Sequence, residues 1–292
     1  GNLNLGVPGI MYLGGIAGLA GAFLYETACP APVPLLGLVI ALLCALAASV
    51  LAGFLYSFLT ITLRANQNVT GLTLTIFGSG VANLFGGAMN KMAGGVGQIS
   101  VSATSGAYRA TLPFLSNIGV FSSLGFMVYL AIALAFIMSW FLMKTRKGLN
   151  LRAVGENPAT ADAAGISVTK YKYLSTCIGA AITGLGGLYY VMDYIKGTWA
   201  NDGGIEKLGW LAVALVIFAR WKPRHAIWGS YLFGVLFWLY FYIGGLTRSS
   251  QELFKMLPYV VTILVLIVVS MRRKHENQPP ASLGQPYFRE DR

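Results

Sequence analysis

The stretch "KTRKGLNLRAVGENPATADAAGISVTKY" (Lys144–Tyr171) is a polar, basic segment in a chain that is otherwise mostly apolar. It lies between two hydrophobic runs, 120–143 and 172–194. A spanning helix needs about 20 mostly apolar residues, and both runs are long enough. A polar connector between two such runs predicts a helical protein that crosses a membrane more than once.

The composition of the whole chain indicates the same fold class. Of its 292 residues, 56% are hydrophobic and 11% are charged, whereas ordinary soluble domains carry about 25% charged residues. We therefore predict an all-α, polytopic transmembrane helical bundle with about eight spans. The predicted spans are 6–26, 33–58, 67–86, 120–143, 172–194, 205–219, 224–243 and 254–271. Residues 1–271 form the predicted transmembrane domain, which contains the loop 144–171, and residues 272–292 form a C-terminal tail.

The formal net charge of +11 is concentrated in one set of alternating loops and in the tail. These segments hold Arg64; Lys144, Arg146, Lys147, Arg152, Lys170 and Lys172; Arg220, Lys222 and Arg224; and Arg272, Arg273, Lys274, Arg289 and Arg292. Cytoplasmic loops carry an excess of Lys and Arg, so both termini and the loop 144–171 are predicted to be cytoplasmic. The basic charge then reflects the topology of the protein in the membrane. A nucleic-acid partner is not predicted, because the sequence lacks aromatic residues interleaved with basic residues on a soluble face.

The sequence offers no constellation for catalysis or metal binding. Cys29, Cys44 and Cys177 are widely spaced and form no CxxC pair, and His225 and His275 lack neighbours at ligand spacing. Neither paired carboxylates within a span, a nucleophile elbow nor a phosphate-binding Walker loop is present. We expect a non-catalytic protein that binds no metal or cofactor of its own.

Within the polar stretch, residues 157–165 predict a short helix. Asn157 is a good N-cap, Pro158 suits the first helical position, and Gly165 is a natural stop after the last turn. A helix of about seven residues is too short to be stable alone in water, so it must pack on something. It is either an ordinary connector on the membrane surface or a docking element whose small residues fit a groove on a cytoplasmic partner.

Two of the predicted spans carry small residues at the spacing that lets helices approach closely in lipid. The first set is Gly14, Gly18 and Ala22, and the second is Ala180, Gly184 and Gly187. The stretch 87–118 is rich in Gly and Ser, contains Pro113 near its end and is predicted to be a long extracytoplasmic loop. Such a loop either only connects spans or receives a partner.

The polar stretch resembles the cytoplasmic loop of permease subunits of bacterial ABC importers in the branched-chain amino acid, ribose and nucleoside group. That family has the pattern T-x-x-G-x-x-x-R-A-x-G-x-N-P-x-A-A-x-x-A-G-I. The residues that match are Thr145, Gly148, Arg152, Ala153, Gly155, Asn157, Pro158, Ala161, Ala164, Gly165 and Ile166, while Thr160 stands where the pattern has an alanine.

In that family the loop forms a coupling helix that inserts into the ATPase. The resemblance implies that the ATPase-coupling residues here are Arg152, Gly155, Glu156, Asn157, Pro158, Ala161, Asp162, Ala164 and Gly165. We expect Glu156 and Asp162 to pair with basic groups of the ATPase, and Arg152 to contact phosphates of the inner leaflet.

Further segments resemble the nucleoside branch of the family. They are "NLNLGVPGIM" (2–11), "ANQNVTGLTL" (65–74), "IFARWKP" (217–223), "MLPY" (256–259) and the tail "PPASLGQPY" (279–287). Pro8 replaces a glutamate of the family pattern, Ala219 replaces a glycine, and "KLGWLA" (207–212) lacks the arginine of a G-R-G-[FY]-I-A motif. Family members also carry at least one span before the first of these segments, so we expect a further span upstream.

The resemblance implies a type II ABC importer in the inner membrane of a bacterium. Two permease subunits, which differ from each other in this branch, would combine with two ATPases that bind ATP and Mg²⁺ and with an extracellular substrate-binding lipoprotein. The implied substrates are nucleosides. By residue type and placement, the candidates for the substrate path are Asn66, Gln67, Asn83 and Trp210, although Asn and Gln inside bundles also commonly join helices.

Three alternatives remain open. A permease for a simple sugar such as ribose would keep the family and change the substrate. An ion-coupled secondary transporter would need ionisable residues deep in the membrane, whereas Glu26 and Asp193 lie near the predicted outer ends of their spans. A purely structural membrane scaffold would leave the segment 153–166 without a purpose.

Overall fold

The computed structural model describes residues 2–92, 99–110, 124–245, 247–272 and 279–288. In these ranges the regular structure is helical apart from one isolated antiparallel bridge between Ser100 and Thr198. The helices are α1 (Val7–Ala28), α2 (Pro34–Ser57), α3 (Gln67–Met92), α4 (Ser102–Arg109), α5 (Phe126–Lys144), α6 (Arg146–Glu156), α7 (Pro158–Ala163), α8 (Val168–Tyr189), α9 (Gly204–Phe218), α10 (Pro223–Tyr242), α11 (Arg248–Lys255) and α12 (Leu257–Arg272). The predicted all-α fold class is confirmed.

Each of the eight predicted spans overlaps one of these helices. Six helical stretches are long and apolar enough to cross a membrane: Val7–Ala28, Pro34–Thr62, Gln67–Met92, Phe126–Lys144, Val168–Tyr194 and Ser249–Ile267. The helix α9 is short, with 15 residues, and neither α9 nor α10 is among the six. A polytopic bundle is therefore confirmed, while the number of eight spans stays a prediction. Residues 120–123 of the fourth predicted span lie outside the described residues.

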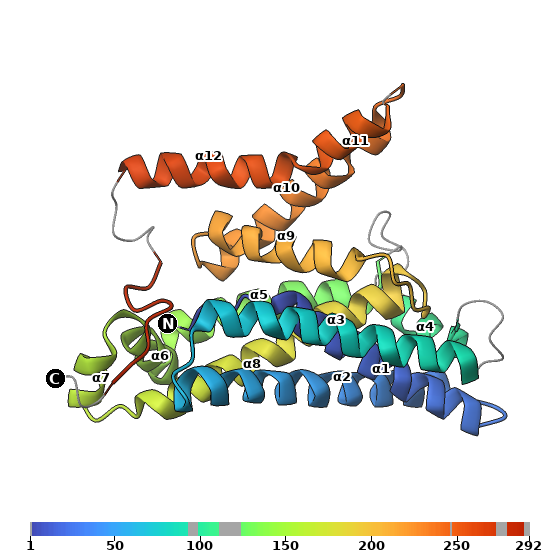
Figure 1. Ribbon diagram of the computed structural model, residues 1–292, viewed down its shortest axis with the longest axis horizontal. Helices are drawn as coiled ribbons and strands as arrows, with labels where there is room; N and C mark the ends of the chain where they lie inside the picture. Colours follow the sequence, from blue (N-terminus) through green and yellow to red (C-terminus); the bar gives the residue numbers. More distant parts are fainter. Residues whose placement is uncertain (1, 93–98, 111–123, 246, 273–278, 289–292) are drawn as a thin grey trace.

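The helix α1 lies at the centre of the bundle, where it packs against α2, α3, α8 and α9. Figure 1 shows α9, α10 and α12 as a second layer over these helices, and α10 also contacts α5. The largest hydrophobic cluster is built around Tyr12, Ile16 and Leu19 of α1, with Leu188 of α8 and Ala41 of α2. The arrangement fixes the start of α1 deep within the bundle.

Glycines allow α1 to approach α8 and α3 at backbone distance. A Cβ atom on Gly14 would lie only 2.7 Å from the Cα of Gly184, and one on Gly78 would lie 2.7 Å from the Cα of Gly9. Because a real Cβ cannot occupy such positions, any larger residue would push the helices apart. The predicted close approach through Gly14 and Gly184 is confirmed.

Two of the places where the sequence departs from the family pattern meet in space. Gly209, which lies within the stretch 207–212 on α9, packs on Pro8 at the start of α1. A Cβ atom on Gly209 would lie 2.7 Å from the Cα of Pro8. The proline and the changed α9 stretch therefore form one contact.

The stretch 87–118 is not an extended loop where the structure describes it. The helix α3 continues to Met92, and residues 102–109 form α4, which packs on α2. The backbone N–H of Thr104, in the first turn of α4, donates to Glu26 Oε1 at 2.8 Å, and Tyr108 Oη donates to the carbonyl of Leu38 at 2.9 Å. Burial raises the pKa of Tyr108, which keeps its phenol a neutral donor. The expectation of a loop is wrong for these residues because Thr104, Ser105 and Tyr108 are buried as parts of a packed helix. Residues 93–98 and 111–118, with Pro113, lie outside the described ranges.

The loops predicted to be cytoplasmic gather at one end of the bundle. Figure 1 shows the N-terminal segment, the α2–α3 junction, α6, α7, the α9–α10 turn and the C-terminal segment at the left end, with α4 at the opposite end. This end of the bundle therefore carries most of the loops that are rich in Lys and Arg. The candidate functional site lies at this end.

Candidate functional site

The helix α6 begins at a sharp turn after α5. Thr145 is its N-cap, and its Oγ1 accepts a hydrogen bond from the backbone N–H of Gly148 at 3.0 Å. A Cβ atom on Gly148 would lie 2.7 Å from the carbonyl carbon of Phe141, so the turn requires glycine at this position. The helix α6 was not predicted from the sequence, although Thr145 as an N-cap is a local signal for a helix start.

The helix α7 begins as the sequence predicts. Asn157 is its N-cap, with Oδ1 accepting a hydrogen bond from the backbone N–H of Thr160 at 3.0 Å, and Pro158 occupies the first helical position. This cap satisfies one of the amide groups that have no partner within the helix.

The same helix also ends as the sequence predicts. Gly165 has a φ of +80°, its N–H donates to the carbonyl of Asp162 at 2.9 Å, and the N–H of Ile166 donates to the carbonyl of Ala161 at 3.0 Å. This pair of bonds is a Schellman motif, which closes the last turn. With 6 residues, α7 is thus defined by its two caps.

Packing supplies the stability that so short a helix lacks alone. Ala161 lies on the inner side of α7 and is 3% exposed, and it contacts Val154 of α6 and Val168 of α8, which are 0% and 3% exposed. Ile166, Tyr171 and Tyr287 cover this cluster. The outward side of α7 presents only small side chains: Ala159, Thr160, Ala163, Ala164 and Gly165 are all exposed.

The C-terminal segment 279–288, here called the tail segment, lies against α6 and α7. The hydroxyl of Ser282 donates to the carbonyl of Gly155 at 2.5 Å, and the N–H of Ala281 donates to Glu156 Oε2 at 3.3 Å. Tyr287 Oη donates to Asp162 Oδ2 at 3.0 Å. The carboxylates of Glu156 and Asp162, which are predicted to pair with basic groups of the ATPase, therefore already accept hydrogen bonds from the tail segment.

The contact of the tail segment with α6 and α7 could not be predicted from the sequence. The residues of the tail segment resemble the nucleoside branch of the family. The segment is far from α6 along the chain, since Ser282 and Gly155 are 127 positions apart. No local pattern reports a contact at that separation.

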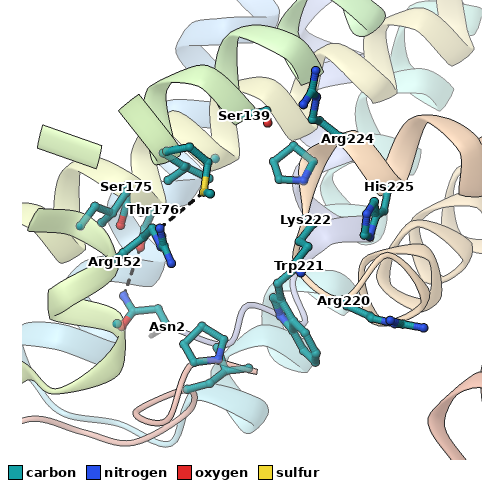
Figure 2. A pocket seen from close by; sticks show the side chains of 18 of the residues that line it. Asn2, Ser139, Arg152, Ser175, Thr176, Arg220, Trp221, Lys222, Arg224 and His225 are labelled. Carbon is teal, nitrogen blue, oxygen red and sulfur yellow. Dashed lines mark hydrogen bonds between the residues drawn. The ribbon is translucent and has the colours of Figure 1, made fainter. Parts of the chain in front are cut away.

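A large cavity of about 1270 Å³ lies beside this surface, between α5, α6, α8 and the α9–α10 turn. Figure 2 shows Arg152 on one side of the cavity and Lys222 and Arg224 on the other. The guanidinium of Arg152 donates to Met143 Sδ at 3.4 Å. Of the predicted coupling residues, Arg152, Gly155 and Glu156 therefore line the cavity and do not lie on the outward side of α7.

The predicted substrate-path residues Asn66 and Gln67 lie at the same end as α7. Asn66 Oδ1 accepts hydrogen bonds from the N–H groups of Asn68 and Val69 at 3.0 and 3.1 Å, so this side chain caps the start of α3. Gln67 is 5% exposed, and its Oε1 accepts a hydrogen bond from the N–H of Leu3 at 2.6 Å. Both amides are used to hold the chain together.

The other two candidates lie elsewhere. Asn83 follows Gln67 by 16 positions on α3, so the two are about 24 Å apart along the helix axis. Its Oδ1 is buried and makes no hydrogen bond within the described residues. Trp210 is half-buried on α9, and none of the four residues lines the large cavity. The structure does not bring the four together, and their role in a substrate path stays a prediction.

The comparison with known families decides what kind of protein carries this site. A family profile described as "Branched-chain amino acid transport system / permease component" matches residues 1–266. The chain belongs to this permease family. The predicted resemblance is confirmed, and the permease is a multi-pass membrane subunit of an ABC transporter, a system in which ATPase partners supply the energy.

Relatives of the permease cover almost all of it. The chain is 32% identical to the guanosine ABC transporter permease protein NupQ of Bacillus subtilis, over 99% of this chain and 88% of the relative. It is 33% identical to the nucleoside ABC transporter permease protein NupC of Lactococcus lactis, over 91% and 83%, and 30% identical to the putative glucose ABC transporter permease protein TsgC13 of Haloferax volcanii, over 99% and 90%. No solved structure matches the chain significantly.

Proposed function

We propose that this permease imports nucleosides across a bacterial inner membrane, driven by partner ATPases that bind the outward side of α7. The observation that carries this proposal is the form of α7: a doubly capped helix of 6 residues whose exposed side is made of small residues. A surface of this kind fits a groove on another protein, because no long side chain has to be ordered or displaced on docking.

The connections of α7 explain how it transmits a movement of the ATPases. The helix α6 follows α5 after Thr145, and α7 leads into α8 through the turn at Gly165. Because both ends of α7 are capped and its inner side is packed, it moves as a unit with α6. A displacement of α7 therefore reaches α5 and α8, which line the large cavity.

The names of the relatives support a nucleoside as the substrate. The relatives that are 32% and 33% identical are named as guanosine and nucleoside permeases. The relative named as a putative glucose permease is 30% identical over 99% of the chain, so a simple sugar such as ribose or glucose is the second candidate.

The proposed assembly contains a second, different permease subunit. Bacillus subtilis has two guanosine permease proteins that match this chain, NupQ at 32% and NupP at 30% identity, and this supports a heterodimer. The ATPases hold ATP and Mg²⁺, and a binding lipoprotein delivers the substrate at the α4 end. Large exposed apolar side chains on α2 and α3, such as Leu35, Leu51 and Ile76 at 68%, 68% and 72% exposed, supply surface for lipid and for the second permease.

Uptake into vesicles tests the proposal. The permease is reconstituted with its partner subunits, and ATP-dependent uptake of labelled guanosine, uridine and ribose is measured. We expect uptake of the nucleosides and its loss on Ala163→Trp, which places a large side chain on the outward side of α7, while Ala163→Ser retains uptake. Uptake of ribose alone would refute the substrate, and uptake driven by an ion gradient without ATP would refute the mechanism.

A further inference from the structure

The tail segment 279–288 touches three neighbouring parts of the chain. It lies against α6, against α7 and against the junction between α2 and α3. Figure 1 shows it beside α6 and α7, at the left end of the bundle. The chain connections of α6 and α7 alone reach only α5 and α8.

The first contact closes the end of α6. The last carbonyl groups of a helix have no partner among its own N–H groups. Gly155 supplies one of these carbonyls, and it accepts from both the hydroxyl of Ser282, at 2.5 Å, and its N–H, at 3.2 Å. Ser282 is 5% exposed, so this pair of bonds is shielded from water. Ser282 is thereby fixed to the α6–α7 turn.

The second contact reaches α7 itself. Tyr287 packs its ring against the cluster of Val154, Ala161 and Val168, and its hydroxyl donates to Asp162 Oδ2 at 3.0 Å. A hydrogen bond to a carboxylate is stronger than one between neutral groups. The tail segment therefore holds α7 by a side chain as well as by the backbone.

The third contact lies on the other side of the tail segment. Gly284 and Pro286 line a small cavity of about 250 Å³ with residues 64–68, the junction between α2 and α3. The guanidinium carbon of Arg64 lies 4.5 Å from the centre of the Phe288 ring, a cation–π contact. The tail segment thus bridges α7 and this junction.

The junction is itself tied to α2, α3 and the N-terminal segment. The N–H of Leu3 donates to Gln67 Oε1 at 2.6 Å, and the hydroxyl of Tyr56 donates to the carbonyl of Leu3 at 2.6 Å. The chain between α2 and α3 includes a π-helical turn, Phe58–Thr62, and Arg64 has a φ of +56°. These are features of a backbone held away from its preferred conformation by its surroundings.

We infer that the tail segment is a strut that carries the displacement of α7 to the α2–α3 junction and the N-terminal segment, with Ser282 and Tyr287 as its positioning residues. The inference rests on the proposed role of α7 in coupling. With the strut in place, a movement of the ATPases reaches α5 and α8 through the chain, and it reaches the α2–α3 junction and the N-terminal segment bound to it through the tail segment.

The test is the number of substrate molecules transported per ATP hydrolysed. The variants Tyr287→Phe and Ser282→Ala are made singly and together in the reconstituted complete transporter. Tyr287→Phe keeps the packed ring and removes only the bond to Asp162, so the fold is preserved even if Ser282→Ala lowers stability. The matched control is Gln285→Ala, whose side chain is exposed in the same segment.

We expect all variants to assemble with the ATPases and to hydrolyse ATP within about twofold of the unaltered protein. Transport per ATP should fall at least fivefold in the double variant, fall measurably in Tyr287→Phe and stay unchanged in Gln285→Ala. Unchanged transport per ATP in Tyr287→Phe and in an assembled double variant would overturn the inference. So would a parallel loss of ATP hydrolysis and transport, because the segment would then serve only in docking.

The same assays separate this inference from the proposed function. If Ala163→Trp abolishes uptake and the tail variants do not change transport per ATP, α7 couples and the strut does not. If Ala163→Trp leaves ATP-dependent uptake intact, the role of α7 itself fails and the inference fails with it.

Discussion

The two ends of the bundle each carry a short helix, α7 at one end and α4 at the other, and the two are held in different ways. α7 is closed by its own caps, Asn157 at the start and Gly165 at the stop. α4 has no side-chain cap from its own N-cap residue; a carboxylate of α1, Glu26, accepts from its first turn, and Tyr108 anchors it to α2.

This difference teaches what each helix is suited for. A helix that carries its own caps keeps its shape when its surroundings move, so α7 is suited to transmit a displacement. A helix whose N-terminal groups are satisfied by another span is fixed to that span, so α4 moves with α1 and α2. The predictions below test this contrast, from the largest expected effect to the smallest.

The largest effect is expected for Gly165→Val. A residue with a Cβ in the left-handed region costs about 1–2 kcal/mol, and a β-branched residue costs most. We expect the stop of α7 to be lost and uptake to fall at least tenfold in a protein that still assembles in the membrane. Gly165→Asn is the matched control, because Asn tolerates this conformation. Equal uptake in the two variants would show that the stop of α7 does not matter.

Asn157→Ala should have the next largest effect. Loss of an N-cap costs about 1 kcal/mol of helix stability. We expect faster hydrogen exchange in 158–164 and a several-fold loss of uptake, whereas Asn157→Asp, which keeps an acceptor, should remain close to the unaltered protein. Unchanged exchange in 158–164 would mean that packing alone defines α7.

Glu26→Ala is expected to act on α4 only. A carboxylate at a helix N-terminus contributes about 0.3–1 kcal/mol, so hydrogen exchange in 102–109 should become faster. Exchange in α7 should not change, since the two helices lie at opposite ends of the bundle. An effect on both helices would remove the contrast between the two ends.

Tyr108→Phe should have the smallest effect. The hydrogen bond from the Tyr108 hydroxyl to Leu38 is worth about 0.5–1.5 kcal/mol, and the ring that fills the space remains. We expect a small decrease in thermal stability of the purified protein and normal uptake. A loss of uptake would assign α4 a part in transport that its packing does not explain.

The sequence predicted those parts of the molecule that depend on local patterns. Hydropathy located the helices of the bundle, and Asn157, Pro158 and Gly165 gave both ends of α7 because caps are decided within a few residues. The spacing of Gly14 and its neighbours identified a real point of close approach between α1 and α8.

The remaining features depend on contacts between distant parts of the chain. Nothing near Ser282 in the sequence reports that it binds the end of α6, and nothing near Glu26 reports that its carboxylate holds α4. The substrate-path candidates were chosen by residue type, and residue type alone did not separate Asn66, which caps α3, from Asn83, whose amide oxygen is buried on the same helix. Such assignments need the three-dimensional arrangement.

The π-helical turn Phe58–Thr62 has a consequence for how chain length varies in this protein. A π turn holds one residue more than the α turn that it replaces. Deleting one residue there would convert the turn into α-helix without rotating the buried face of α2 at Ala45, Ser49 and Ala52. The α2–α3 junction is therefore a place where the chain can lose a residue while the register of the bundle core stays the same.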